Sequence, residues 1–378
     1  MRATHLQTVL AGVRRRYRSS GADLPFGDPR PAHGLAMEGY FWRVTDVTGG
    51  RTLIALAGIN QPSDRSAPWA TLGLASSAGF LRTVATDEGY ADPRRLGARS
   101  GTAFVADDTR VRVDLGPDAL CEFTIRDPIA WPRASFGGSS VFQSVPGLNQ
   151  YWHPWLLGGR ASGTAVFGCE RWEFTDAQVY AEKNWGKGGF PDSWWWGQAQ
   201  GFAEPGACVA FAGGLVHAGP LRKFGLRTTV TALVVRLPAG HVVRLGNPGL
   251  SPVHADVTDE DWRLSGRGYG WDIEVHGWAP IGQAHVLPVP LPDERRNTAG
   301  DLEHLAADLG ITVRRRGRVV WRGHTALAAL EHGGLARAEA ELGRRGIPPG
   351  ATDAPPEGPR PPGAADPQGP TGSVVEAG

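Results

Sequence analysis

Cysteine, lysine and long apolar runs are scarce in this sequence, and each scarcity argues against a class of protein. The three cysteines, Cys121, Cys169 and Cys208, are far apart and form no Cys-x-x-Cys pair, so we expect neither a disulfide framework nor a zinc site. No run of about 18 apolar residues occurs, which argues against a membrane-spanning helix. The first residues lack the continuous apolar segment of a secretory signal, so a cytoplasmic location is the default expectation.

Net charge and short motifs give no indication of a charged ligand. The net charge is +1, so neither nucleic acid nor a strongly acidic substrate is expected. The histidines show no His-Glu-x-x-His or His-x-His spacing, and the chain has no Walker A or Gly-x-Ser-x-Gly motif. We therefore expect no bound metal, no cofactor and no α/β-hydrolase chemistry.

Glycine and proline, in contrast, are abundant at 53 and 30 residues, which favours short strands joined by tight turns. Alternating patterns predict hairpins at 40–56, 110–125, 229–245 and 311–321, and a further strand at 271–276. This spacing, with almost no helical segments between strands, predicts an all-β protein of antiparallel barrels or sandwiches. A short helix capped by Asp301 is the main predicted exception in the interior, over 301–309.

Both ends of the chain differ from this pattern. Within residues 1–30, Leu6, Val9, Leu10 and Val13 have helical spacing and are followed by several arginines. This basic amphipathic helix either packs on the body of the protein or makes a peripheral contact with anionic lipid. At the other end, a helix is predicted over 335–346, and the Pro/Gly-rich segment 347–378 is predicted to be a disordered tail.

The most informative segment runs from Tyr180 to Gln198. It begins as a strand, passes through a glycine-rich turn and re-enters a strand at three consecutive tryptophans, Trp194, Trp195 and Trp196. Tryptophan on both faces of one strand requires that both faces are covered or that one lines a cavity. The chain has 14 tryptophans, about three times the ordinary share. We expect a Trp-lined apolar cavity, and the alternative is a Trp-rich core that binds no ligand.

Two stretches of this sequence carry a family resemblance. The run Ala181-Glu182-Lys183-Asn184-Trp185-Gly186, with Gly189-Phe190-Pro191 and the three tryptophans after it, resembles the signature of the tocopherol cyclase family. The run Glu38-Gly39-Tyr40-Phe41-Trp42-Arg43-Val44, preceded by His33, resembles that family's entry strand, and 328–334 resembles its closing strand. The likeness extends from about residue 31 to 334 and is most specific in the centre.

The sequence departs from the plant members of that family at two places. The turn Gly186-Lys187-Gly188-Gly189 is one residue longer as we align it. After Gln198 the chain reads Ala-Gln-Gly-Phe, without the cysteine expected in the plant enzymes. Both departures leave the architecture intact and put the identity of the substrate in question.

The resemblance implies a fold and a reaction. The fold is two antiparallel calycin-like or lipocalin-like β-barrel halves, here 31–190 and 191–334. The reaction is closure of a prenylated quinol to a chromanol without a redox cofactor, so the expected partner is a hydrophobic prenylated small molecule. The rival reactions are hydration of an isoprenoid or another cation-forming lyase step, and the rival from another class is a lipocalin-like lipid carrier.

Ring closure of this kind sets requirements that can be matched to residues. An alkene is a weak base, so its proton must come from a carboxylic acid kept neutral by burial. The candidate acids are Glu182, which we prefer, Asp192 and Glu38. If Lys183 faces solvent, Glu182 faces inward with Asn184, because side chains alternate along a strand. The alternatives are a Glu182 bound to turn amides and an Asp192 that caps a turn.

The remaining expectations concern substrate binding. Electron-rich aromatic faces stabilise a carbocation, and amides can orient the quinol. The expected binding residues are Trp42, Asn184, Trp185, Trp194, Trp195, Trp196 and Gln198. For the two amides, the alternative role is to satisfy buried backbone groups.

Overall fold

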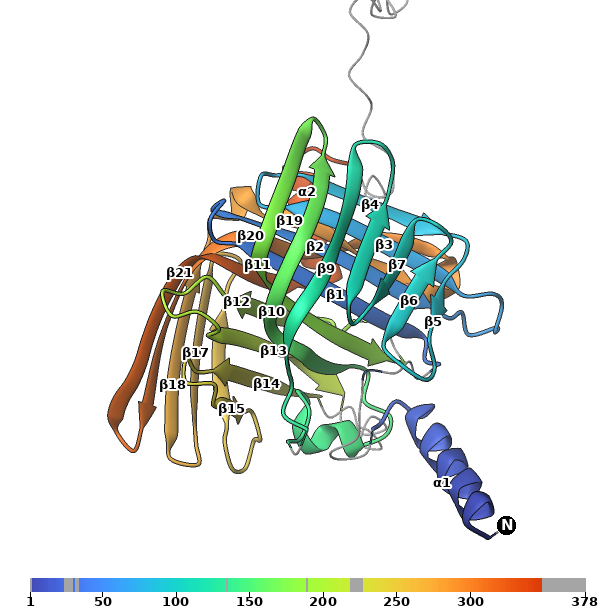
Figure 1. The fold of residues 1–378 in the computed structure, drawn as a ribbon, viewed down its shortest axis with the longest axis horizontal. Helices are drawn as coiled ribbons and strands as arrows, with labels where there is room; N and C mark the ends of the chain where they lie inside the picture. The colour runs from blue at the N-terminus through green and yellow to red at the C-terminus, as the bar shows by residue number, and fades with distance from the viewer. Residues whose placement is uncertain are drawn as a thin grey trace, which may run out of the picture.

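The computed structural model describes residues 2–23, 30, 34–133, 135–187, 190–217 and 227–348. Its strands form two large antiparallel sheets that curl and pack against each other (Figure 1). The prediction of an all-β protein of two lipocalin-like halves is therefore confirmed. His33, Gly188, Gly189 and the predicted tail from 349 onward lie outside the described residues.

The first sheet takes all of its strands from the N-terminal half of the chain. Its order is β4-β3-β2-β1-β11-β10-β9-β8-β7-β6-β5. The strands are β1 (Met37–Asp46), β2 (Arg51–Asn60), β3 (Trp69–Ser76), β4 (Leu81–Thr86), β5 (Tyr90–Ala91), β6 (Gly97–Ser100), β7 (Phe104–Asp107), β8 (Arg110–Asp114), β9 (Ala119–Ala130), β10 (Tyr151–Phe167) and β11 (Glu170–Gly186).

The second sheet takes all of its strands from the C-terminal half. Its order is β15-β14-β13-β12-β21-β20-β18-β17-β16, with β19 also paired to β20. The strands are β12 (Trp194–Ala199), β13 (Cys208–His217), β14 (Arg227–Arg236), β15 (Val242–Leu245), β16 (Val253–Val257), β17 (Asp261–Gly268), β18 (Trp271–Trp278), β19 (His285–Leu291), β20 (Arg296–Arg315) and β21 (Arg318–Gly333). Short 3₁₀ helices lie at Ser140–Ser144, Ile281–Gln283 and Pro292–Glu294.

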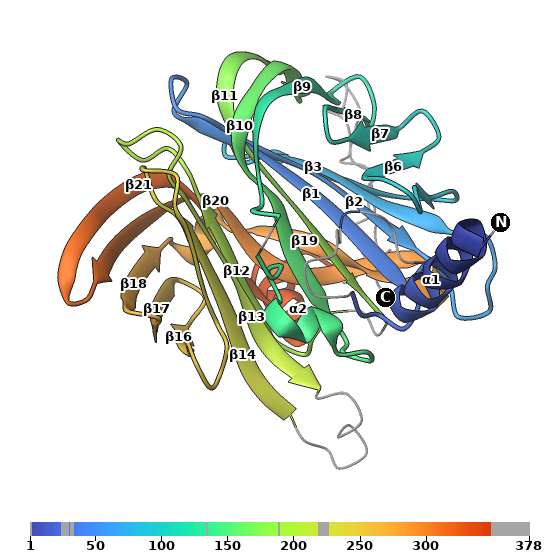
Figure 2. The ribbon, with the colours of Figure 1, turned by 60° about the horizontal axis from the view of Figure 1, so that its bottom comes forward.

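Successive side chains point to opposite faces of each strand, so the apolar side chains of the two sheets are divided between three cores. On β1, Tyr40, Trp42 and Val44 enter the core enclosed by the first sheet. On its other face Phe41 packs toward the second sheet, against Trp196 of β12. A second core lies inside the curl of the second sheet, and a third lies between the two sheets (Figure 2). The layer between the sheets positions the site described below.

The segment 301–309 corrects one prediction, because it forms part of strand β20 instead of a helix. Its Asp301 pairs with Gly333 and its Glu303 pairs with Glu331 of β21, so long-range pairing determines its conformation. Asp301 is thus a strand residue and caps no helix. The consequence is that the acidic side chains of Asp301 and Glu303 are both buried.

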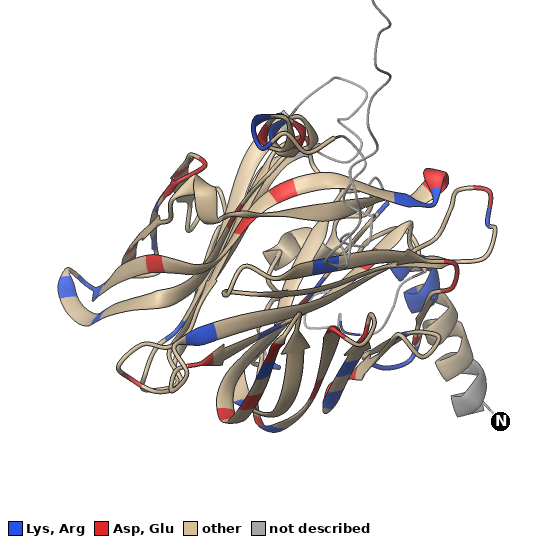
Figure 3. Cartoon of the chain, turned by 90° about the horizontal axis from the view of Figure 1, so that it is seen from above, with Lys and Arg blue, Asp and Glu red and all other residues tan. Residues whose placement is uncertain are grey.

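Two helices lie at the ends of the described chain, α1 (Arg2–Arg18) and α2 (Leu335–Arg344). α1 extends away from the sheets, with its arginines at the end nearest the body (Figures 1 and 3). Leu6, Val9, Leu10 and Val13 remain 49–61% exposed, so the apolar stripe of this helix does not pack on the body. None of the helices in the described part of the chain combines the length and apolarity needed to cross a membrane.

Candidate functional site

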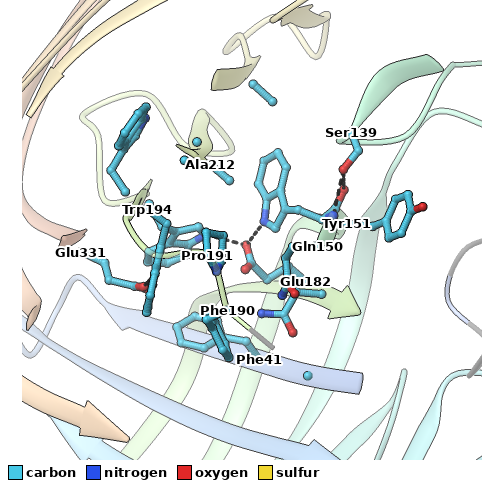
Figure 4. A pocket seen from close by; sticks show the side chains of 18 of the residues that line it. Phe41, Ser139, Gln150, Tyr151, Glu182, Phe190, Pro191, Trp194, Ala212 and Glu331 are labelled. Atoms are coloured by element: carbon cyan, nitrogen blue, oxygen red, sulfur yellow. Dashed lines mark hydrogen bonds between the residues drawn. The ribbon is translucent and has the colours of Figure 1, made fainter. Parts of the chain in front are cut away.

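A cavity of about 460 Å³ lies between the two sheets. One wall comes from β1, β2, β10 and β11 of the first sheet, and the other comes from β12, β13, β14, β19, β20 and β21 of the second. Trp194, Trp195 and Trp196 all line it, as do Phe41 and Phe190 (Figure 4). The predicted Trp-lined apolar cavity is therefore present, and it lies between the two barrel halves.

Glu182 is the polar centre of the first wall. It lies on β11, is 5% exposed and receives three hydrogen bonds on one oxygen, Oε2. The donors are the Trp152 indole N–H at 2.7 Å, the Trp196 indole N–H at 2.8 Å and the Tyr180 hydroxyl at 2.5 Å. Among the described residues none bonds to the other oxygen, Oε1. Oε1 is therefore the oxygen left open to carry a proton.

Opposing effects set the proton affinity of Glu182. Burial raises its pKa from 4.5 to about 7, although the three donors favour the ionised form and act in the other direction. A group with this pKa exchanges its proton readily at neutral pH. Glu182 is suited to accept or to donate a proton.

The inward direction of Glu182 has a different cause from the one expected. Lys183 does not face solvent: it is fully buried inside the first sheet, where its Nζ lies 2.8 Å from Oε2 of Glu38. Tyr40 and Trp185 flank the ammonium group. Alternation still places Glu182 and Asn184 on the opposite face, toward the cavity.

Three further carboxyl groups crowd the second wall. Asp301 and Glu303 come from β20 and Glu331 comes from β21, and one oxygen of each lies within 4.8 Å of the others. Asp301 and Glu303 are 5% and 1% exposed, and the carboxyl groups of Glu303 and Glu331 are close enough to share a hydrogen bond when one of them carries a proton. The Trp194 indole N–H donates to Oε1 of Glu331. Three carboxylates this close in an apolar wall cannot all be ionised.

Burial and mutual repulsion keep protons on this group of three. Burial first, then repulsion by Glu331, raises the pKa values of Asp301 and Glu303 well above their ordinary values. Burial raises the pKa of Glu331 to about 7. At neutral pH the group therefore holds at least one proton in contact with an apolar cavity. Clustered carboxylate oxygens are also the ligands that hard divalent cations prefer, so the same three residues could hold Mg²⁺ or Ca²⁺.

Several residues expected at the site lie elsewhere. Trp42 and Trp185 are buried in the interior of the first sheet, where Trp42 contacts Tyr40 and Trp185 stacks on Tyr151. Neither indole lines the cavity, because both lie on the strand face opposite to Glu182. The structure thus gives no support for a role of these two tryptophans in substrate binding.

Gln198, Glu38 and Asp192 also lie outside the cavity lining. The Gln198 carbonyl accepts a 2.8 Å hydrogen bond from the buried Arg43 guanidinium, so this amide satisfies a buried charge between the sheets. Glu38 is paired with Lys183, and Asp192 is exposed on the turn before β12. These positions do not support catalytic roles for the two acids.

Asp301, Glu303 and Glu331 are the functional candidates that sequence reasoning missed. The run Asp301-Leu302-Glu303 alternates polar and apolar residues, which is a short strand signal that competes with the helical spacing of Leu302, Leu305 and Leu309. Glu331 lies in the stretch that resembles the family's closing strand. Only the pairing of β20 with β21 brings the three together.

With the fold and the cavity established, comparison with known proteins shows the family. A model described as tocopherol cyclase-like matches residues 119–334, more than half of the chain. The chain belongs to the tocopherol cyclase-like family. This confirms the family predicted from the central motif.

Curated relatives include two plant proteins. The chain is 34% identical over 203 residues to the chloroplastic tocopherol cyclase of Zea mays, covering 52% of this chain and 39% of the maize protein. It is 34% identical over 130 residues to the probable chloroplastic tocopherol cyclase of Oryza sativa subsp. japonica, covering 33% of this chain and 27% of the rice protein. The matched region therefore spans less than half of either relative.

Among solved structures, CghA has the same fold. Its superposition gives a TM-score of 0.55 at 14% identity and covers 79% of this chain and 88% of CghA. CghA bound to Sch210972 gives a TM-score of 0.54, also at 14% identity, and covers 82% of this chain and 95% of CghA. At this identity the likeness concerns the fold of the tocopherol cyclase-like chain and leaves its chemistry open.

Proposed function

We propose that this tocopherol cyclase-like protein closes the ring of a prenylated quinol by moving two protons in the cavity between its sheets. One proton is added to the alkene nearest the quinol ring, and the phenolic oxygen gives up its proton as it bonds to the adjacent carbon. The product is an isomer of the substrate, so no oxidant or reductant is consumed. The family membership supports the reaction class, and the arrangement of carboxyl groups supports the proton transfers.

The observation that carries the proposal is the group of three carboxyls on an apolar wall. An acid for alkene protonation must still carry its proton at neutral pH and must contact the apolar part of the substrate. Glu303 meets both requirements, since its pKa is raised well above the ordinary value and its side chain lines the cavity. Repulsion by Glu331 supports the neutral form, and turnover is completed when the proton released by the phenol is returned to Glu303, for which Glu331 can act as the relay.

Glu182 is the group proposed to accept the phenolic proton. Three donors on Oε2 stabilise its carboxylate form, which leaves Oε1 to receive the proton. This assignment differs from the role of acid expected from sequence, because burial and mutual repulsion keep protons on the group of three, whereas three hydrogen-bond donors favour the ionised form of Glu182. Acid and base then lie on different sheets with the substrate between them.

Aromatic side chains supply the remaining requirement. Positive charge develops on the alkene carbon during protonation, and the faces of aromatic rings attract a cation by about 0.5–2 kcal/mol each when water is excluded. Trp194, Trp195, Trp196 and Phe41 line the cavity between the two acidic centres. An apolar lining also limits capture of the cation by water, which would produce a hydrated product.

The test is incubation with a panel of prenylated quinols, followed by mass and ultraviolet spectra. We expect a product of unchanged mass that resists oxidation to a quinone. Glu303→Gln and Glu182→Gln should each lower turnover by about a hundredfold or more, a typical general acid–base contribution, while quinol binding persists. A product heavier by one water molecule would show a hydratase. Binding without conversion would show a carrier, and either result would overturn the proposal.

A further inference from the structure

Two amide side chains on the cavity wall have buried polar atoms that no described protein group satisfies. These atoms are Oδ1 of Asn184 and both Oε1 and Nε2 of Gln150. Both residues line the cavity. Buried polar groups are nearly always hydrogen-bonded, and leaving one unsatisfied is destabilising. Three such atoms close together in one wall indicate a binding position for a polar part of the ligand.

Two glycines make room for these amides. A Cβ on Gly39 would lie 1.8 Å from Oδ1 of Asn184, so the amide occupies the space of a missing side chain. A Cβ on Gly186 would lie 2.9 Å from Oε1 of Gln150 and closer still to the Asn149 backbone carbonyl. Both glycines belong to the two motifs that identify the family from sequence. Neither glycine has a left-handed backbone conformation that would require glycine, so close packing is what excludes a side chain, at Gly39 against the Asn184 amide and at Gly186 chiefly against the Asn149 backbone.

The amide pair lies beside the proposed base. Asn184 and Glu182 are two residues apart on one face of β11, which separates their Cα atoms by about 7 Å. Trp152, whose indole bonds Glu182, is directly opposite Asn184, and Gln150 is two residues before it. Figure 4 shows Gln150 on the same side of the cavity as Glu182. A ring with one oxygen at Glu182 can therefore place a second oxygen, on its far side, at the amides.

We propose that Asn184 and Gln150 bind the second oxygen of a 1,4-quinol, the one that does not enter the new ring. Its hydroxyl group donates to Oδ1 of Asn184 and accepts from Nε2 of Gln150. This inference rests on the proposed function and adds to it the recognition of both ring oxygens. The two amides are positioning residues, because they hold the ring with its reacting oxygen at Oε1 of Glu182.

The experiment compares two substrates that can both cyclise. One is a prenylated 1,4-quinol, and the other is the same molecule without the second hydroxyl group. The wild-type protein should prefer the quinol by about 10–100-fold in kcat/KM, because the analogue leaves buried amides unsatisfied. Equal kcat/KM values for the two substrates would overturn the inference.

Variants then show which residues cause the preference for the quinol over the monophenol. Asn184→Leu with Gln150→Leu should reduce the preference to about one, because kcat/KM for the quinol falls by a larger factor than kcat/KM for the monophenol. Gly39→Ala keeps both amides but displaces Asn184, and should reduce the preference in part. Asn149→Leu is the matched control, since its Oδ1 is also buried without a partner but does not line the cavity. A preference that persists in the double variant would overturn the assignment.

Binding separates this inference from the reaction itself. If the wild-type protein converts neither substrate, the proposed function fails, and the affinities of the two compounds are compared by quenching of tryptophan fluorescence. A tighter quinol complex in the wild type, lost in the double variant, would still support the amide pair as a hydroxyl-binding position. Equal affinities of the wild-type protein for the two compounds would rule out the amide pair as a hydroxyl-binding position.

Discussion

The Trp196 indole N–H donates to Oε2 of Glu182 at 2.8 Å, and this bond joins the two sheets across the cavity. Trp196 lies on β12, the first strand of the second sheet, and Glu182 lies on β11, the last strand of the first. The pair thus holds the proposed base in place from the opposite wall. Docking of the two sheets and the protonation state of Glu182 are physically linked.

Tyr180→Phe tests how the donors set the proton affinity of Glu182. The Tyr180 hydroxyl is the largest of the three hydrogen-bonding effects that lower this pKa, and it does not line the cavity. Its loss should raise the pKa above about 7, so the ascending limb of kcat/KM against pH should move up by about one to two units. An unchanged or lower limb would argue against Glu182 as the base.

Stability should fall as pH rises through the range where the buried acids titrate. The pKa of Glu331 is about 7 in the folded chain against 4.5 when unfolded, so the folded state binds more protons between these values. Its stabilising contribution is complete below pH 4.5 and is lost by about pH 7, a change of up to about 3 kcal/mol.

Urea unfolding of Glu331→Gln at pH 5 and pH 8 measures this contribution. The amide carbonyl can still accept the Trp194 indole bond, so the variant should show a smaller loss of stability between the two pH values. Glu339→Gln, on the exposed side of α2, is the control and should keep the wild-type difference. The prediction fails if both variants behave alike.

The buried pair of Lys183 and Glu38 should be costly to break from one side. Lys183→Met leaves an uncompensated carboxylate in the interior of the first sheet and should lower the free energy of unfolding by about 3–5 kcal/mol. The double variant with Glu38→Gln should lose less than Lys183→Met alone, because no charge remains unpaired. Denaturant titration of Lys183→Met, Glu38→Gln and the double variant measures the loss in free energy of unfolding of each. A loss in the double variant equal to the sum of the two single losses would contradict the prediction.

Removal of divalent cations by a chelator tests whether the group of three carboxyls acts through its protons or by binding a metal ion. If Asp301, Glu303 and Glu331 act through their protons, dialysis against EDTA should leave turnover unchanged, and added Mg²⁺ should not raise it. A loss of activity restored by a divalent cation would show that these residues form a metal site instead.

Secondary structure was predicted correctly where the apolar residues follow one clear period. The prediction failed where the periods of a helix and of a strand are both present. Alternation and consecutive tryptophans predicted the strands around Glu182 and the Trp-lined wall. In 301–309, Leu302, Leu305 and Leu309 have helical spacing, while Asp301 and Glu303 also fit the period of a strand. Pairing with β21 decides between them, and this contact depends on residues that are far apart in the chain.

Side-chain direction was harder to predict than secondary structure. A lysine in a strand is ordinarily exposed, so nothing local to Lys183 indicates that it is buried. Its partner Glu38 is 145 residues away. For Trp42, Trp185 and Gln198, the strand was predicted but the face was not. A family motif records that a residue is needed, without stating whether it contacts ligand or stabilises the core.

The division of the strands between the sheets has a consequence for synthesis of the chain. Every strand of the first sheet is complete by Gly186, before any strand of the second sheet begins at Trp194. A ribosome-bound intermediate can therefore complete its first half while the second is still being made, as chains generally fold from the N-terminus during translation. Until Trp196 emerges and docks, Glu182 lacks one of its three donors. The cavity between the sheets is thus among the last features of the molecule to form.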